Sequence, residues 1–438
     1  MPAHRQVVIT GLGVVSPLGN SKQALWEALC SGRSGVVRLD DWFPTAGRVG
    51  APAQFSGSID DFGPLEPELK KAIRKGLKLM CRECQMGVAA AQLALADAGL
   101  RPGTYDPDRC GVVFGADYML SEQYDLVPAY QACISREEGF DFSRWAHQGM
   151  PQLSPLWLLK YLPNMPASHV AIYNDLRGPN NSLTLREASA NLAVGEAFRT
   201  IVRGHAECMV AGATGSRIHP MRALHAVIQE EVAADGSDPA GACRPFDLHR
   251  QGMVLGEGAA AVVLEERCAA IQRGATIYAR VAGMGSSHVS ARNGVARRSQ
   301  ALTHALAAAL READLAPELL GHVQAHGLAT HSCDIEEYGA LERVLGRAVQ
   351  RIPVTAAKSY FGNLGAASGL VELVAGVLAL LEGRLFPILN YATPDPACPI
   401  AAVRPGTQAD PGRSFANLSV TPQGQASCLV VCRDDGGQ

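Results

Sequence analysis

Hydrophobic residues occur along this chain mostly in short continuous runs and seldom in strict alternation with polar ones. A strand covered on one face alternates, whereas a strand covered on both faces is apolar throughout its length. The runs therefore predict buried strands of a layered α/β fold, with helices between them. The predicted strands are residues 7–10, 110–114, 208–211, 259–264, 323–325 and 428–432.

A weak internal repeat accompanies two of these strands. Residues 95–102 (LADAGLRP) and 310–317 (LREADLAP) each resemble a helix end and a turn with proline, and each leads into a buried strand. The helix before the first is indicated by apolar residues three and four positions apart, at Met86, Ala89, Ala90 and Leu93. We therefore expect two homologous α/β halves, residues 1–266 and 267–438.

Residues 117–176 differ from the rest of the first half. They contain Trp145, Trp157, several tyrosines and four closely spaced prolines between 151 and 166. This composition indicates a long excursion from the α/β half. We expect it to pack over the functional site or against a second subunit.

Composition narrows the possible partners. The 438 residues are 47% hydrophobic and 18% charged, with a net charge of −3, so no basic field favours nucleic acid or an anionic membrane. The start lacks the regions of a signal peptide, and no apolar stretch is expected to span a bilayer. The 12 scattered cysteines are typical of reduced thiols in a cytoplasm, so we expect a cytoplasmic protein.

One close cysteine pair, Cys81 and Cys84, leaves two interpretations open. It could be half of a zinc site, or two small apolar residues on one helix face. No second Cys-x-x-Cys or histidine pair accompanies it, which favours the second interpretation. We therefore expect neither a metal nor a cofactor.

Five glycine-rich or polar motifs span nearly the whole chain. They are residues 7–19, 159–167, 178–197, 244–258, and the pair 325–330 with 358–369. In content and order they resemble the β-ketoacyl-acyl-carrier-protein synthase (ketosynthase) family of the thiolase superfamily. The resemblance implies the thiolase fold, two α/β halves in a five-layered αβαβα arrangement, usually as a dimer.

The resemblance also implies a set of site residues. In the family, a cysteine at a strand-to-helix turn accepts the acyl chain, and the helix N-terminus favours its thiolate. Aligning residues 182–189 (SLTLREAS) with that turn places Glu187 at the cysteine. His326 matches the first of two histidines that bind the malonyl thioester, Asn363 replaces the second, and Lys358 matches a lysine that opens the second motif.

Further positions either support or depart from the family pattern. Thr330, Asp334 and Glu337 match residues downstream of the first histidine, and an ion pair of Lys358 with either acid is possible. Leu328 replaces a threonine. The family's glycine-rich gating loop is replaced by residues 416–425 (ANLSVTPQGQ), so we expect the pocket to have different walls.

A carboxylate cannot perform the acyl-thioester chemistry of a thiolate, so the resemblance implies a condensing-enzyme fold without fixing the reaction. We favour a chain-length-factor-like partner of an active ketosynthase in fatty acid or polyketide biosynthesis. It would meet acyl carrier protein bearing an acyl or malonyl phosphopantetheine thioester, as a homodimer or as a heterodimer with that ketosynthase.

Three other functions stay open. The chain could be a malonyl-carrier-protein decarboxylase that holds the thioester oxygen with His326 and Asn363. It could use Glu187 and His326 as a general acid–base pair in another carrier-protein reaction. It could also be a working synthase whose cysteine lies elsewhere, although no cysteine lies in the turn around Glu187.

Overall fold

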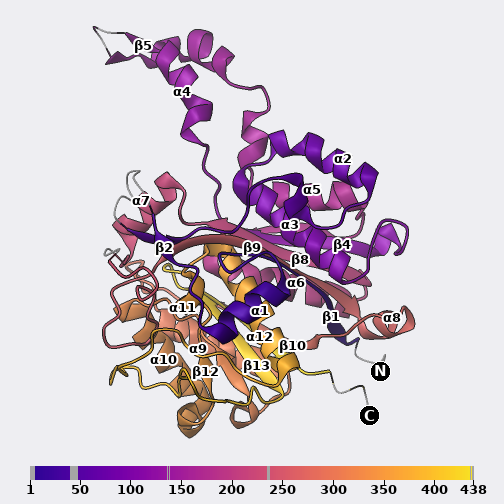
Figure 1. The fold of residues 1–438 in the computed structure, drawn as a ribbon, viewed down its shortest axis with the longest axis vertical. Coiled ribbons are helices and arrows are strands. Elements are labelled where there is room, and N and C mark those ends of the chain that lie inside the picture. Colours follow the sequence, from indigo (N-terminus) through magenta and orange to yellow (C-terminus); the bar gives the residue numbers. More distant parts are fainter. Residues whose placement is uncertain are drawn as a thin grey trace.

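A computed structural model of the chain describes residues 5–39, 48–135, 137, 139–233, 237–434 and 436 (Figure 1). Ten strands form one continuous path of a large mixed sheet. Those of the first half are β1 (Val7–Val15), β4 (Cys110–Ala116), β7 (Asn180–Thr184), β8 (Cys208–Ser216) and β9 (Leu255–Glu266). Those of the second half are β10 (Ala279–His288), β11 (His322–Gln324), β12 (Val354–Thr355), β13 (Ser414–Val420) and β14 (Gln425–Cys432).

The two sets of five strands have the same topology. The first lies in the order β7-β4-β8-β9-β1 and the second in the order β12-β11-β13-β14-β10. In each set the first three strands are parallel and the last two join antiparallel. The sets meet where β1 pairs with β10, from Val7 opposite Val281 to Ile9 opposite Ala279. This equivalence confirms the duplicated α/β fold.

Helices complete five layers. The longer ones are α1 (Lys22–Ser31), α2 (Pro67–Gly76), α3 (Arg82–Asp97), α4 (Gln123–Ala132), α5 (Met165–Asn174), α6 (Ser189–Val202), α7 (Pro220–Gln229), α9 (Arg298–Glu312), α10 (His331–Leu345) and α12 (Ser368–Glu382); α8 (Arg267–Gln272) and α11 (Lys358–Phe361) are short. Helices α6 and α12 lie between the two sets of strands, α3 covers the outer face of the first, and α9 covers that of the second (Figure 1).

Paired glycines allow the outer helices to lie directly on the strands. A Cβ at Gly13 of β1 would come 2.0 Å from the carbonyl oxygen of Ala90 in α3. At the equivalent position of β10, a Cβ at Gly285 would come 1.9 Å from the carbonyl oxygen of Ala305 in α9. Only a residue without a side chain fits so close to a helix backbone. The same packing solution thus occurs in both halves.

The strands expected from the apolar runs are all present, although most are longer than the runs themselves. Strand β8, for example, extends to Ser216, because glycine, threonine and serine continue it with buried side chains. The predicted helix around Met86 is α3, which is buried around most of its circumference and not only on one face.

The expectation that no apolar stretch could span a bilayer is wrong by length and composition. Residues 365–382, which include α12, are long and apolar enough, with a mean hydropathy of 1.7. In this fold 89% of that stretch is buried inside the protein, because α12 fills the space between the two sets of strands. A core helix therefore explains its apolar character.

Two further short strands and one hairpin lie outside the ten-strand path in the described residues. Strands β2 (Val37–Arg38) and β3 (Val49–Ala51) pair with each other, and β3 also lies beside β9. Strands β5 (Ile134–Ser135) and β6 (Gly139–Phe140) form a separate hairpin inside the 117–176 excursion. The excursion departs from the end of β4 and returns to α5.

Candidate functional site

Glu187 lies in the turn between the end of β7 and the start of α6. Arg186, immediately before it, has a positive φ of 52°, which few residues other than glycine adopt. The Ser189 hydroxyl accepts a hydrogen bond from the Leu185 N–H at 2.8 Å and donates one to the Ala116 carbonyl at 3.1 Å. These bonds fix the turn against the end of β4. The Glu187 side chain is thereby buried in the protein interior.

Three side chains surround the Glu187 carboxylate. The Arg217 guanidinium and the Asn363 amide both donate hydrogen bonds to Oε1, the second at 3.1 Å, and the Arg186 guanidinium lies 3.7 Å from Oε2. Burial by itself raises the pKa of Glu187, but the charges of Arg217 and Arg186 outweigh it and hold that pKa well below its usual range. Glu187 is therefore an anion at neutral pH.

Arg217 connects Glu187 to a chain of buried charges. Arg217 follows β8 directly and lies 3.6 Å from Asp117, which in turn lies 3.8 Å from Arg222 of α7. Arg222 donates a hydrogen bond to Glu83 of α3 at 3.2 Å. Burial raises the pKa of Glu83 to about 7 although Arg222 opposes it. This network fills the space beside Glu187 with charged groups.

A second branch runs from Arg186 to the C-terminal hairpin. Arg186 donates hydrogen bonds to Glu230 at 3.1 Å and to Gln423 at 3.2 Å. Gln423 lies in the tight turn between β13 and β14, which is closed by the Thr421 N–H donating to the Gln425 carbonyl at 2.8 Å. The segment 416–425 is thus the strand β13 followed by a short turn, and Gln423 of that turn contacts the Glu187 site through Arg186.

Asn363 reaches the same site from the second half. Its backbone bonds to the start of β9, donating to the Val254 carbonyl at 2.8 Å. Its side-chain oxygen accepts from the Gly365 N–H at 2.9 Å and the Ser368 hydroxyl at 3.2 Å, which fixes the amide orientation. The amide nitrogen then points to Glu187 and to the Met253 sulfur, so both of its donors have acceptors.

His326 and Lys358 form a separate buried pair. The Lys358 ammonium lies 3.3 Å from His326 Nδ1 and donates to the His326 carbonyl at 2.7 Å. An ammonium has no acceptor, so Nδ1 accepts and the ring proton is on Nε2, which has no hydrogen-bond partner among the described residues. Burial and the Lys358 charge hold the pKa of His326 well below its usual range. His326 is therefore neutral and presents one free donor.

The ion pair left open for Lys358 forms with a different acid. Lys358 bonds to Glu372 of α12, and neither Asp334 nor Glu337 is its partner among the described contacts. No spacing pattern pointed to Glu372, because it lies in the middle of an apolar helix. Burial raises the pKa of Glu372, with Lys358 opposing it.

Asp334 and Glu337 instead hold the loop that carries His326. Glu337 accepts from the N–H groups of His326 and Gly327 at 2.7 and 2.8 Å, and Asp334 accepts from those of Leu328 and Ala329 at 3.0 and 3.2 Å. Thr330 is the residue before α10, and its hydroxyl has no partner among the described residues. These supporting residues position the loop, and they do not contact Glu187 in any described interaction.

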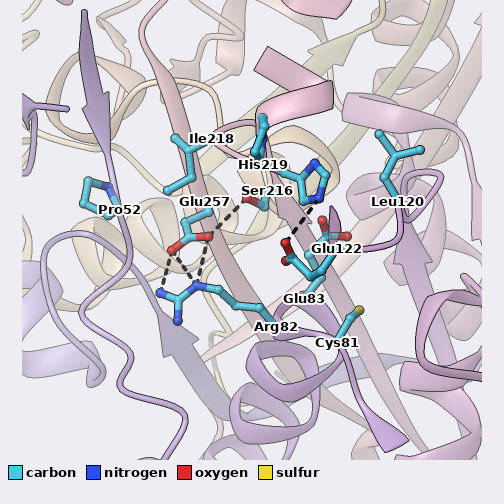
Figure 2. Close-up of a pocket in the computed structure, with 11 residues that line it drawn as sticks. Pro52, Cys81, Arg82, Glu83, Leu120, Glu122, Ser216, Ile218, His219 and Glu257 are labelled. Carbon is cyan, nitrogen blue, oxygen red and sulfur yellow. Dashed lines mark hydrogen bonds and ion pairs between the residues drawn. The ribbon is translucent and has the colours of Figure 1, made fainter. Parts of the chain in front are cut away.

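A pocket of about 430 Å³ lies at the far end of the charge network (Figure 2). The Nε and Nη2 groups of Arg82 both donate hydrogen bonds to the Glu257 carboxylate. The Ser216 hydroxyl donates to the same carboxylate at 3.1 Å. These bonds tie Glu257 of β9 to α3 and to the end of β8. Glu83, the last member of the network, also lines this pocket, as Figure 2 shows. Cys81 lines it too, and its thiol lies 3.7 Å from the Met119 sulfur.

Within the described ranges, no group of three or more His, Cys, Asp or Glu could hold a metal ion.

Two family domains match the chain. The β-ketoacyl synthase N-terminal domain matches residues 4–270 and the β-ketoacyl synthase C-terminal domain matches residues 278–392. The 3-oxoacyl-[acyl-carrier-protein] synthase 2 of Synechocystis is 32% identical over 420 residues, which are 94% of this chain and 92% of that protein. The chain therefore belongs to the β-ketoacyl synthase family. It is a ketosynthase-like protein of fatty acid or polyketide biosynthesis.

Solved structures agree with this assignment. A β-ketoacyl synthase from Burkholderia phymatum is 29% identical, with a TM-score of 0.84 over 98% of this chain and 100% of that chain. The ishigamide ketosynthase/chain length factor is 25% identical, with a TM-score of 0.81 over 99% of this chain and 100% of that one. The thiolase fold expected from the sequence is thereby confirmed.

The sequence motifs identified Glu187 at the turn, but they did not identify the charged residues of the network beside it. Arg217, Arg222 and Asp117 lie far from Glu187 along the chain, and no spacing rule links them. One signal was available. Arg217 directly follows a strand that is apolar or small along its whole length, and a charged residue there must be paired if it is buried.

Proposed function

We propose that this chain is a non-condensing, chain-length-factor-like subunit that pairs with an active ketosynthase. The observation that carries the proposal is the fixed anion of Glu187, at the turn where we place the family's acyl-accepting cysteine. Its carboxylate is buried and ion-paired with Arg217. A nucleophile for acyl transfer needs an available thiolate or an activated hydroxyl. A carboxylate held by two arginines offers neither.

The surroundings of Glu187 also favour a subunit without condensing activity. An acyl chain attached at this turn would lie against Arg217 and Asp117, and apolar groups gain nothing from contact with buried charges. The likeness to a ketosynthase/chain length factor supports a role beside a cysteine-containing subunit. In such a pair, acyl carrier protein would deliver its thioester to the active subunit.

The direct test uses the purified chain with acyl- and malonyl-carrier protein. We expect intact-mass spectrometry to find no acyl group on the chain and no β-ketoacyl product. An acyl adduct on the wild-type chain that is lost in Glu187→Ala would contradict the proposal. Addition of the ketosynthase that co-purifies with the chain should give condensation.

A second function, malonyl-carrier-protein decarboxylation, is favoured by one observation. The neutral His326 presents a free Nε2–H that could donate to a thioester oxygen. Asn363 would have to supply the other donor, and its amide is already bound to Glu187 and Met253. We therefore rank this function below the partner role.

The decarboxylase function is tested by mass spectrometry of the carrier protein. Conversion of malonyl- to acetyl-carrier protein by the wild type, abolished in His326→Ala, would establish it. We expect no conversion by the wild type. Glu187→Gln is the informative control, because it removes the anion while retaining the shape, and we expect no conversion by it either.

A further inference from the structure

A second pocket, of about 400 Å³, lies where the two halves of the fold meet. It is lined by the start of β1, by the part of β10 that pairs with it, and by the C-terminal ends of α6 and α9. Helix α6 begins just after Glu187 and rises about 1.5 Å per residue, so its far end lies about 20 Å from that residue. The pocket also shares no lining residue with the pocket of Figure 2. It is therefore separate from the Glu187 site.

The lining of this second pocket is strongly cationic. Of its twelve described residues, four are arginines and one, Glu312, is an acid. The arginines are Arg5, Arg199, Arg203 and Arg280. Four positive charges and one negative charge leave +3, whereas the whole chain has a net charge of −3. A concave surface with one sign of charge concentrates ions of the opposite sign, so this pocket should attract anions.

Three of the four arginines are not neutralised by an acid of the described chain. Arg199 pairs with Glu312 at 3.4 Å. Arg5, Arg203 and Arg280 have no ion pair with any described residue. The Nη1 group of Arg5 is also buried without a hydrogen-bond partner among the described residues. A buried donor without an acceptor is unfavourable, so a ligand that accepts a hydrogen bond from it is stabilised.

The helix dipoles account for only part of this charge. Helices α6 and α9 both end at the pocket, and each C-terminus carries roughly −0.5 of a charge, which nearby arginines stabilise. The two ends together contribute roughly −1, so about +2 of the +3 remains. Arg5 precedes β1 and Arg280 belongs to β10, so neither is part of a helix end. The pocket therefore stays cationic after its helix ends are neutralised.

The chemistry of the cations favours phosphate over other anions. A guanidinium presents its N–H groups as a planar fork that matches two oxygens of a phosphate group. Arg5, Arg203 and Arg280 converge on the pocket from three separate segments of the chain, and a phosphate group has enough oxygens to accept from several of them. The volume of about 400 Å³ lies within the range of small-molecule sites and is larger than a simple ion requires.

We propose that this pocket binds a phosphate-bearing small molecule, whose phosphate oxygens accept hydrogen bonds from Arg5, Arg203 and Arg280. Nothing in the Glu187 site contributes to this binding. The inference does not rest on the proposed function, because the pocket lies at the other end of α6 and uses different residues. It gives a role to a cluster of arginines that the charge network beside Glu187 leaves unexplained.

The experiment measures the binding of two probes to the full chain by isothermal titration calorimetry. Inorganic pyrophosphate presents the phosphate groups alone, and adenosine 5′-diphosphate presents them on an organic molecule. We expect Arg280→Gln to weaken binding roughly tenfold or more, because it removes a charged donor. Arg203→Gln tests the same contact at an exposed position outside the sheet, where folding is not at risk. Arg347→Gln, at an exposed arginine of the second half, is the matched control and should bind as the wild type does.

The outcomes decide both the site and the source of the phosphate. No binding of either probe by the wild type at millimolar concentration would overturn the inference. Wild-type affinity in both Arg280→Gln and Arg203→Gln would also overturn it, and so would an equal loss in Arg347→Gln. With the expected losses, tighter binding of adenosine 5′-diphosphate supports a site for an organic phosphate, and equal binding of the two probes supports a site for the phosphate groups alone.

Discussion

At the scale of single residues, the site is defined by the pairing of Glu187 with Arg217. Both side chains are almost completely buried, and each neutralises the other. Removing one member of a buried pair leaves an uncompensated charge, which costs more than removal of both. Arg217 therefore contributes to this site as much as Glu187 does. A single exchange at position 187 would leave Arg217 without its partner.

Stability measurements test this pairing. We expect Glu187→Gln to lower the free energy of unfolding by about 3–5 kcal/mol, and Glu187→Gln with Arg217→Met to recover most of that loss. Urea unfolding of the four chains of the cycle gives the coupling. The exposed pair of Lys70 and Asp60 is the control, and Asp60→Asn should change stability little. Additive effects at 187 and 217 would show that the pair is not coupled.

The same pairing predicts the behaviour of Glu187→Cys. We expect this variant to form no β-ketoacyl product with acyl- and malonyl-carrier protein. The acyl chain on the new thiol would still face Arg217 and Asp117, and the turn at Gln423 would still lie against Arg186. Product analysis by mass spectrometry is the measurement. Restored condensation would mean that the charged surroundings matter less than the nucleophile.

The pH dependence of stability should report Glu83. Burial raises its pKa from 4.5 in the unfolded chain to about 7 in the folded one, so between these values only the folded chain holds the proton. The free energy of unfolding then falls as pH rises through this window, by at most about 1.4 kcal/mol per pH unit for this group. Glu83→Gln cannot titrate, so its curve between pH 5 and pH 7 should be flatter in urea unfolding. Parallel curves would contradict the shift.

At the scale of secondary-structure elements, the glycines of β1 and β10 set the distance between strand and helix. We expect Gly13→Ala to destabilise the protein by about 3 kcal/mol or more, because its Cβ would meet the backbone of α3 at 2.0 Å. Gly339→Ala in α10 is the matched control. Its nearest contact is the Ser299 hydroxyl at 3.3 Å, so a gain of about 0.5–1 kcal/mol is expected. Equal effects in thermal unfolding would refute the close-packing explanation.

The elements were largely predictable because burial on both faces produces continuous apolar runs, and each predicted run became a strand. The repeat at 95–102 and 310–317 also reflects the duplication of the fold. Its first copy precedes β4 and its second copy precedes β11, and these two strands are equivalent in the two halves. The 117–176 segment was predictable only as an excursion. Its direction depends on tertiary anchoring, such as the pair of Lys160 and Asp125, which no local pattern encodes.

The site was predictable only in part, for a related reason. His326 and Lys358 were found through local motifs, and the structure brings them into contact. Asn363 was also found, but its bond to Glu187 was not, because it joins the two halves. The arginines that decide the charge state of Glu187 are Arg217, directly after β8, and Arg186 in the turn itself. Their roles follow from the packing of distant segments, which one sequence does not specify.

At the scale of the whole molecule, two α/β halves share one continuous path of strands, and charged groups surround Glu187 inside this body. The charged network beside Glu187 comes from the first half, and Asn363 of the second half binds Glu187. In the proposed function, this chain has no nucleophile of its own and acts through a partner subunit. The buried charges around Glu187 support this proposal of a non-condensing member of a pair.

The stoichiometry of the native complex tests this assignment most directly. The tagged chain, purified from cells that also make its synthase, is examined by native mass spectrometry. The account predicts a one-to-one heterodimer with a cysteine-containing condensing enzyme, in which acyl groups are found only on that enzyme. A homodimer of this chain that by itself extends an acyl thioester would contradict the account.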